Sequence, residues 1–456
     1  MPEPRDLSLV EAAQRLRKRK LGAVELVQSC LERIEAREPQ VRAWVRVYSD
    51  AALAEAKRLD RRAKRGDFAG PLHGIPLGVK DIFDVAGMET RAGTAAYTPR
   101  VAEADAASVA CLRGAGAIVL GKTETTAFAD GDPAPTRNPW DLSRTPGGSS
   151  SGSGAGVADR MCLGALGSQT AGSVLRPASY NGIVGFKPTH GAISLAGVIP
   201  FAWSLDHVGT LTRTVADSWL LWSLLRLTAP ASAGRTSRRG GLPTPPGRGT
   251  LGTRKPSPRK PRRLWRLRGL FEKEASAESL AAFEKACRTL AKGGAKIVER
   301  PLPPAFDNVL AAQERIMHAE AAAYHRDNFA QRGHLYPPLI SRMIGQGQAA
   351  TAVELALAYE QRRRIRIELA PLLAEVDAAL TPTTVGPAPT PETTGPRTFQ
   401  APWSIAGLPT ITLPCALSSD GLPLGVQLVG AAHAEDDLFA VCAWAESRLG
   451  FDARPA

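Results

Sequence analysis

The 456-residue sequence lacks any apolar run of the roughly 18 residues that a membrane-spanning helix requires. The longest candidate, within residues 219–225, is short and is followed by Arg226. The N-terminus also lacks the basic region and the apolar region of a secretory signal peptide. These absences predict a cytoplasmic protein that has no membrane partner.

Cysteine and histidine are scarce and scattered. The six cysteines form no Cys-x-x-Cys pair, and none stands beside a histidine at the spacing of a zinc site: Cys30, Cys111, Cys162, Cys287, Cys415 and Cys442. The seven histidines are equally dispersed. The sequence therefore predicts reduced, mostly buried thiols and no metal site.

Acidic residues are absent from one long segment, and this local absence explains the formal net charge of +13. Residues 234–270 contain twelve Arg or Lys and no Asp or Glu, so the remainder of the chain is nearly neutral. Within this segment, residues 234–263 are rich in Gly, Pro, Ser and Thr, which predicts a basic low-complexity loop insert. Basic loops can contact nucleic-acid phosphates. No aromatic side chain precedes Trp265 for bases to stack on, so a solvated linker is favoured over a nucleic-acid partner.

The rest of the chain has the composition of a globular α/β protein, with 44% hydrophobic and 22% charged residues. Helical patterns cover residues 9–66, 106–114, 215–227, 277–292, 306–373 and 435–449, and a further helix is expected after the turn at 121–126. Strand patterns cover residues 72–79, 117–120, 264–271, 295–299, 377–380, 410–413 and 425–429. Strands and helices alternate, and no linker divides two cores, so a single α/β domain spanning 1–456 is predicted.

Two turns rich in glycine present serines that are candidates for nucleophilic chemistry. Ser149 lies in Gly147–Gly154, and Ser173 follows Thr170-Ala-Gly172. A serine hydroxyl needs a base to remove its proton. Lysine can be that base where burial keeps it neutral, and an apolar run delivers Lys80 to the end of a predicted strand.

Each of these residues also has a structural interpretation. Lys80 could form an ion pair with Asp81 or Asp84, and Ser173 could be the N-cap of a short helix. The Gly/Ser stretch could be a flexible loop, and spacing does not rank its four serines. The small residues before Ser173 could instead turn several backbone N–H groups toward one point, as an oxyanion requires.

The order and spacing of Lys80, Gly-Gly-Ser-Ser at 147–150 and Ser173 resemble the amidase signature family of serine hydrolases. The likeness extends to most of the chain outside the basic insert. It includes the segments 72–81, 138–140, 182–189, 204–209, 408–414 and 421–430.

This resemblance implies an α/β fold with a central mixed sheet wrapped by helices, and a catalytic set that needs no cofactor. Ser173 would be the nucleophile, Ser149 a proton-relaying bridge that follows a cis peptide bond, and Lys80 the general base. The backbone N–H groups of Thr170, Ala171, Gly172 and Ser173 would form the oxyanion hole.

Three residues depart from the pattern of the family. Ala171 replaces a common glycine, which keeps the N–H group but disfavours a positive φ. Gln169 stands where the related chains of tRNA-dependent amidotransferases frequently have Asp, and Arg176 lies three residues after Ser173 rather than two. The last two departures disfavour an amidotransferase chain. Arg176 is a candidate clamp for a substrate carboxylate, with a structural ion pair as the equal alternative.

The resemblance therefore implies a hydrolase of C–N bonds other than peptide bonds. Its substrate would be a small-molecule amide, anilide or carbamate (urethane), with aryl esters cleaved as a side activity. The alternative is the amidase-like chain of a tRNA-dependent amidotransferase, which requires a partner chain. A non-catalytic binding protein is disfavoured because all three motif residues are present. A homodimer is compatible with the sequence.

Overall fold

The computed structural model describes residues 3–228 and 256–456. The predicted basic insert at 234–263 lies outside these residues, apart from its last part at 256–263. At that end, the backbone N–H groups of Arg262 and Arg263 donate hydrogen bonds to the Asp377 carboxylate, and the Arg259 guanidinium pairs with the same group at 2.6 Å. These contacts attach the C-terminal end of the segment to the sheet.

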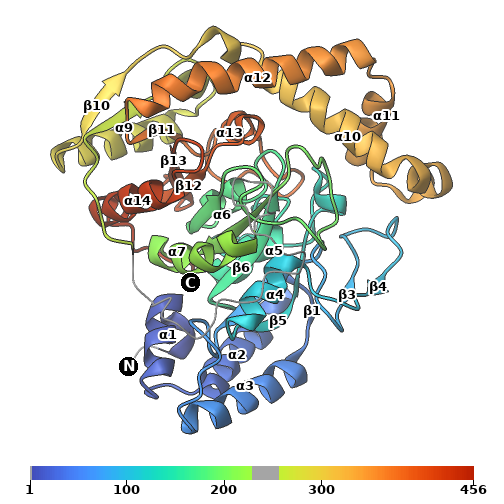
Figure 1. The fold of residues 1–456 in the computed structure, drawn as a ribbon, viewed down its shortest axis with the longest axis vertical. Helices are drawn as coiled ribbons and strands as arrows, with labels where there is room; N and C mark the ends of the chain where they lie inside the picture. Colours follow the sequence, from blue (N-terminus) through green and yellow to red (C-terminus); the bar gives the residue numbers. More distant parts are fainter. Residues whose placement is uncertain (1–2, 229–255) are drawn as a thin grey trace, which may run out of the picture.

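A large mixed sheet runs through the molecule (Figure 1). Within the described residues it has eleven strands in the order β1 (Trp44–Val47), β5 (Ile118–Thr123), β2 (Pro76–Lys80), β6 (Gly164–Gln169), β8 (His207–Thr212), β7 (Val184–Lys187), β12 (Thr410–Leu417), β13 (Pro423–Val429), β11 (Ala378–Pro382), β9 (Arg263–Arg266) and β10 (Lys296–Glu299). The β5, β2 and β6 strands are parallel neighbours, whereas β6, β8, β7, β12 and β13 pair in antiparallel fashion. The mixed sheet predicted for this chain is confirmed.

Helices flank the sheet and make the chain a single α/β domain. They are α1 (Leu9–Arg17), α2 (Ala23–Val41), α3 (Ser49–Lys64), α4 (Ala107–Gly114), α5 (Ser151–Ala158), α6 (Leu175–Tyr180), α7 (Val215–Leu225), α8 (Leu270–Lys273), α9 (Ala277–Lys292), α10 (Val309–Arg332), α11 (Pro338–Gln348), α12 (Ala352–Ala374), α13 (Ala401–Ala406) and α14 (Glu435–Leu449). In Figure 1, α10 and α12 cross one end of the molecule, and α1 to α3 lie at the other end. No helix of the described residues is long and apolar enough to cross a membrane.

Most predicted elements are confirmed, and three predictions need correction. The pattern at 9–66 is helical except for β1, which lies between α2 and α3. The turn predicted at 121–126 is wrong in its first half, since residues 121–123 complete β5 and no α-helix follows directly. The strand predicted at 264–271 ends at Arg266, because Gly269 adopts a φ of 73° and α8 begins after it. All six cysteines are free, and four of them are buried, as predicted.

The Gly/Ser segment forms the crowded centre of the domain. Every residue of α5 is buried, and the helix contacts β6, β2, β5 and β8. A Cβ atom at Gly152 would lie 2.1 Å from the Ala43 carbonyl oxygen and 2.4 Å from the Glu124 amide nitrogen. Only glycine permits this approach of two backbones. The segment is therefore a buried turn that leads into a packed helix, and the flexible-loop interpretation is wrong.

A buried ion pair joins the ends of β2 and β5. The Lys122 ammonium lies 2.8 Å from the Asp81 carboxylate, and both side chains are fully buried. Burial lowers the pKa of Lys122 and raises that of Asp81, because removal from water disfavours both charges. The Asp81 carboxylate also accepts a hydrogen bond from the Arg91 amide, and Lys122 donates one to Thr90.

We expect Lys122→Met to lower the free energy of unfolding by about 3–5 kcal/mol, because it leaves the Asp81 charge buried without a partner. Urea unfolding at neutral pH measures the change. The control is Arg100→Met, which removes a half-exposed guanidinium from its pair with Asp84 and should cost at most about 1 kcal/mol. Equal effects of the two substitutions would contradict the importance of the buried pair.

Candidate active site

The Lys80 side chain lies inside the molecule at the end of β2. The strand is buried along its whole length, which places the ammonium group among hydroxyls rather than in water. Its Nζ donates to Ser149 Oγ at 2.7 Å and to Ser168 Oγ at 2.9 Å. Among the residues described, it forms no ion pair with a carboxylate. Its two neighbouring carboxylates are engaged elsewhere, Asp81 with Lys122 and Asp84 with Arg100, so the ion-pair interpretation of Lys80 is wrong.

Burial lowers the pKa of Lys80 well below the ordinary lysine value. The nearby Asp206 charge opposes this shift, and the Arg176 guanidinium adds to it. A lysine in this setting can exist as a neutral amine at moderate pH and accept a proton from a hydroxyl that touches it.

Ser149 is distinguished from the other serines of its turn by its contacts. The Ser150, Ser151 and Ser153 hydroxyls donate to backbone carbonyl oxygens, and only that of Ser149 meets Lys80. The peptide bond between Gly148 and Ser149 is cis, which confirms the expectation from the family resemblance.

Ser173 lies in the turn between β6 and α6, close to the turn of Ser149. The amide of Ser150 donates to the Ser173 carbonyl oxygen at 3.3 Å. The Ser173 hydroxyl has no hydrogen-bond partner among the described residues, so no bond joins it to the Ser149 hydroxyl. It is not the N-cap of α6, because the Gln169 side-chain oxygen accepts from the amides of Val174 and Leu175 instead. The N-cap interpretation of Ser173 is therefore wrong.

The turn before Ser173 presents backbone N–H groups to a pocket. Within the described part of the chain, the amides of Ala171, Gly172 and Ser173 have no hydrogen-bond partner. Buried amides are nearly always paired, so three unpaired amides in a row are unusual. They can donate hydrogen bonds to an anionic oxygen in the pocket. Ala171 is not among the residues with positive φ, and alanine therefore fits this position without strain.

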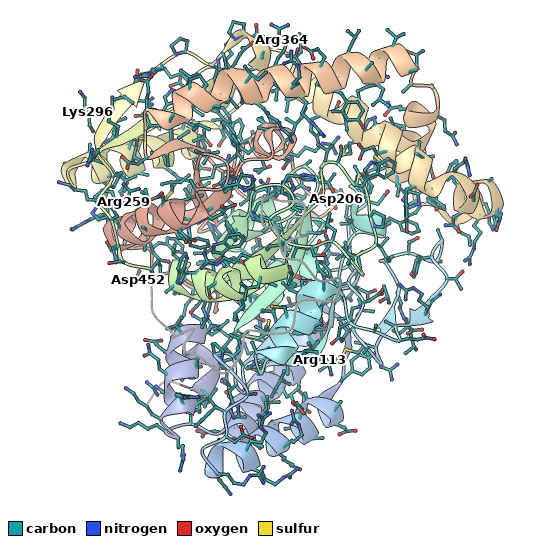
Figure 2. The ribbon with its side chains drawn as sticks, in the orientation of Figure 1. Arg113, Asp206, Arg259, Lys296, Arg364 and Asp452 are labelled. Atoms are coloured by element: carbon teal, nitrogen blue, oxygen red, sulfur yellow. The ribbon has the colours of Figure 1, made fainter. Side chains whose placement is uncertain are left out.

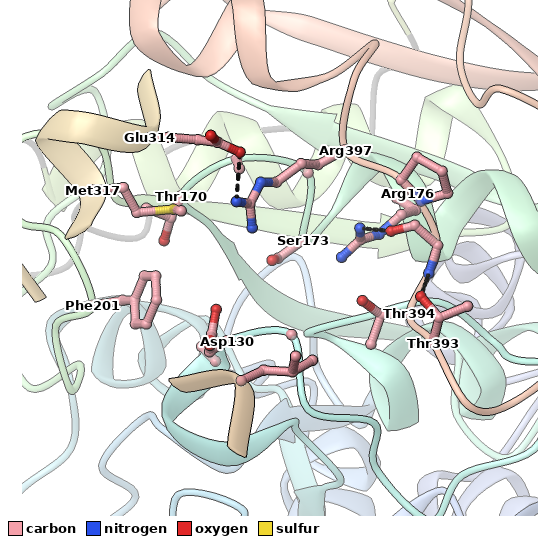
Figure 3. Close-up of a pocket in the computed structure, with 17 residues that line it drawn as sticks. Asp130, Thr170, Ser173, Arg176, Phe201, Glu314, Met317, Thr393, Thr394 and Arg397 are labelled. Carbon is pink, nitrogen blue, oxygen red and sulfur yellow. Dashed lines mark hydrogen bonds and ion pairs between the residues drawn. The ribbon is translucent and has the colours of Figure 1, made fainter. Parts of the chain in front are cut away.

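The pocket beside Ser173 has a volume of about 280 Å³. Its wall combines apolar groups, charged groups and backbone, and Figure 3 shows Ser173 at its centre. The charged residues are Asp130, Arg176, Glu314 and Arg397, and the large apolar ones are Phe201, Met317 and Leu339. A pocket of this size suits a small substrate.

Arg176 lines the pocket but forms no ion pair with a carboxylate among the described residues. Its Nε and Nη2 donate to the Gly148 carbonyl oxygen at 3.1 and 2.7 Å, and its Nη1 donates to the Gly395 carbonyl oxygen. The alternative of a structural ion pair is thus wrong. Burial lowers the pKa of Arg176 to about 10, which leaves the guanidinium charged at neutral pH.

Sequence reasoning missed Asp206, which lies near the centre of the molecule (Figure 2). Its carboxylate accepts a hydrogen bond from the Thr170 hydroxyl at 2.5 Å and from the amides of Phe201 and Ala202. Burial raises its pKa to about 7. Asp206 thereby ties the turn before Ser173 to the pocket wall at Phe201. Ser168, the second partner of Lys80, was also missed, because neither residue stands in a distinctive spacing.

The described residues contain no group of three His, Cys, Asp or Glu side chains that could hold a metal ion. The absence of a metal and of a cofactor from the reaction remains a prediction.

The comparison with known families agrees with this geometry. The model of the family described as Amidase matches residues 25–439. The chain belongs to the amidase family. An amidase from Pseudomonas putida is 36% identical over 437 residues, covering 91% of this chain and 90% of that protein. A chain of the glutamyl-tRNA(Gln) amidotransferase from Myxococcus xanthus is 34% identical, and the match covers 99% of both sequences.

The fold of this chain is also found in solved structures of amidases. A crystal structure of an amidase has a TM-score of 0.85 and 34% sequence identity, covering 97% of this chain and all of the other. Together with the family match, this establishes an amidase-family hydrolase that acts on amide C–N bonds.

Proposed function

We propose that this amidase cleaves small-molecule amides, anilides or carbamates (urethanes) through an acyl-enzyme on Ser173, with aryl ester hydrolysis as a side activity. The observation that carries the proposal is the hydrogen bond between the buried Lys80 amine and Ser149. The turn that contains Ser149 is hydrogen-bonded to the turn that contains Ser173. The uncharged amine has a lone pair for the Ser149 proton, and Ser149 can then accept the proton of Ser173.

The reaction would proceed in two stages. Ser173 Oγ attacks the carbonyl carbon while its proton moves through Ser149 to Lys80. The negative oxygen that forms is stabilised by the backbone N–H groups of Thr170, Ala171, Gly172 and Ser173. Lys80 returns the proton through Ser149 to the leaving nitrogen as the C–N bond breaks. Water then attacks the acyl-enzyme by the same route in reverse.

Amides, carbamates and esters all pass through a similar tetrahedral oxyanion, so this machinery accepts each of them in principle. Esters are the least demanding, since an aryloxide leaves without prior protonation. The apolar side of the pocket, formed by Phe201, Met317 and Leu339, favours substrates with a short hydrocarbon part.

The second candidate is the amidase-like chain of a tRNA-dependent amidotransferase, and the Myxococcus xanthus relative favours it. Such a chain would work with a partner chain. Gln169 and the position of Arg176 disfavour this candidate, and activity of the isolated chain would decide between the two.

We expect the isolated chain to hydrolyse matched chromogenic anilide, carbamate and aryl ester substrates, and Ser173→Ala to lower kcat by about 10⁴-fold or more. The control is Ser153→Ala, whose buried hydroxyl donates to the Leu166 carbonyl and does not touch Lys80. It should retain activity within about tenfold. Release from no substrate by the wild-type chain would favour the partner-dependent amidotransferase.

The pH dependence of ester hydrolysis tests Lys80. Only the deprotonated amine accepts a proton, so kcat/KM should rise with pH, with a midpoint well below 10.5. Lys80→Met should abolish this rise with pH and lower the rate by about 10²–10⁴-fold. Asp206→Asn should move the midpoint of the rise to lower pH without abolishing it, because the Asp206 charge raises the pKa of Lys80. A profile that is flat from about pH 5 to about pH 9 would contradict the lysine base.

We also propose that Arg176 binds a substrate carboxylate. A guanidinium has five N–H donors, and three hydrogen bonds of Arg176 go to carbonyl oxygens. The remaining donors can face the pocket that Arg176 lines. Two of these bonds also hold the Gly148 carbonyl that precedes Ser149, which gives Arg176 a second way to affect catalysis.

Kinetics with succinamate and the neutral pentanamide separate these two effects. Loss of the clamp in Arg176→Ala should raise KM for succinamate by about 10- to 100-fold and leave KM for pentanamide nearly unchanged. An equal fall in kcat for both substrates, without a change in KM, would show that Arg176 only positions the Ser149 turn.

A further inference from the structure

Asp130 is a pocket carboxylate that the proposed reaction does not use. It lies in the wall of the pocket that contains Ser173, and 9% of the Asp130 surface is exposed. Its carboxylate accepts no hydrogen bond from another side chain of the described residues, and only the amide of Gly131 adjoins it. In Figure 3, Asp130 lies below Ser173, across the pocket from Arg397 and Glu314.

The two guanidinium groups of the pocket do not neutralise Asp130 by direct contact. Arg397 pairs with Glu314 at 3.1 Å, and Arg176 donates to the carbonyl oxygens of Gly148 and Gly395. Both cations lower the pKa of Asp130 from a distance, but burial dominates and raises it to about 6. The carboxylate is therefore mostly ionised at neutral pH, and no cation of the described residues pairs with it directly.

The backbone holds this carboxylate in a fixed place. Phe128 and Ala129, directly before Asp130, have φ values of 49° and 68°, which non-glycine residues adopt at a cost of about 1–3 kcal/mol each. The Thr126 hydroxyl donates to the Asp130 carbonyl oxygen at 2.5 Å, and the Phe128 ring stacks on Tyr336. Two costly conformations retained beside a pocket indicate that the position of Asp130 matters for function.

We propose that Asp130 is a specificity residue that binds an ammonium group carried by the substrate. A buried carboxylate with one backbone amide and no paired cation has lost most of its hydration, and a cationic N–H donor from the substrate compensates for that loss. The amidase would then prefer amides with an amino group a few bonds from the reacting carbonyl. This inference rests on the proposed function, because it takes the pocket of Ser173 as the substrate site.

Binding to the inactive Ser173→Ala protein tests Asp130 independently of catalysis. Calorimetry compares 4-aminobutanamide with pentanamide, which has the same shape but a methyl group in place of the ammonium. We expect the ammonium ligand to bind about 10- to 100-fold more tightly. Equal binding of the two ligands, or weaker binding of 4-aminobutanamide, would overturn the proposal without any substitution at Asp130.

The preference should disappear when Asp130→Asn is added to this protein, while the affinity for pentanamide is retained and shows that the pocket is intact. The control is Asp132→Asn, which removes the same charge two residues away. The Asp132 carboxylate accepts from the amides of Leu339 and Ile340, and asparagine can serve in the same role. A preference that survives Asp130→Asn, or that Asp132→Asn abolishes equally, would also overturn the proposal.

Failure of the proposed function gives a different result. If the wild-type chain hydrolyses neither amide but Ser173→Ala still prefers the ammonium ligand through Asp130, ammonium binding by Asp130 is supported and the proposed hydrolysis is contradicted. If pentanamide is hydrolysed by way of Ser173 with no preference for 4-aminobutanamide, the proposed hydrolysis is supported and the role of Asp130 is contradicted.

Discussion

The burial of one amine among hydroxyls is the constraint on which the rest of the site depends. Lys80 can act as a base only where water is excluded and where no carboxylate forms a direct ion pair with its charged form. The fold meets the first condition by placing it at the end of a fully buried strand. It meets the second by giving each adjacent carboxylate another cation, Lys122 for Asp81 and Arg100 for Asp84. The ion pairs around β2 thus contribute to the chemistry as well as to stability.

Hydroxyl groups contact the Lys80 amine directly, and charged side chains act on it from a greater distance. Ser149 and Ser168 contact the nitrogen directly, and the charged groups Asp206 and Arg176 act on it with opposite sign. Both of these side chains also hold neighbouring segments in place. Asp206 accepts from the Phe201 amide and the Thr170 hydroxyl, and Arg176 donates to the Gly148 carbonyl oxygen. The same side chains therefore set the electrostatic field and fix the two serine turns.

The spacing of apolar residues along the sequence was sufficient to predict helices on the outside of the fold, such as α9. Helix α9 spans the predicted residues because its apolar face repeats at helical spacing and Ser276 caps it. The central strands β6, β7 and β8 were not predicted. The β6 and β8 strands are buried and interrupted by Gly, Ser or Thr, and β7 is only four residues long, so none of them carries a clear alternation of polar and apolar residues. In the site, Lys80 and Ser173 were candidates from their sequence context, whereas the family resemblance selected Ser149 and gave all three residues their roles. The structure brings Lys80 and Ser149 into contact. Ser168, Asp206 and Asp130 become visible only in three dimensions, because tertiary contacts and not sequence spacing distinguish them.

The turn before Ser173 is tied to a part of the chain that is synthesised much later. Ser404 in α13 accepts a hydrogen bond from the Gln169 side chain and donates one to the Ala171 carbonyl oxygen at 2.7 Å. Arg176 likewise requires the carbonyl of Gly395. During translation, the serines and the lysine therefore emerge well before the residues that hold them in place. A nascent chain that ends before residue 404 carries Lys80, Ser149 and Ser173 but lacks contacts that hold their turns, so the proposed site is assembled only after α13 has been synthesised.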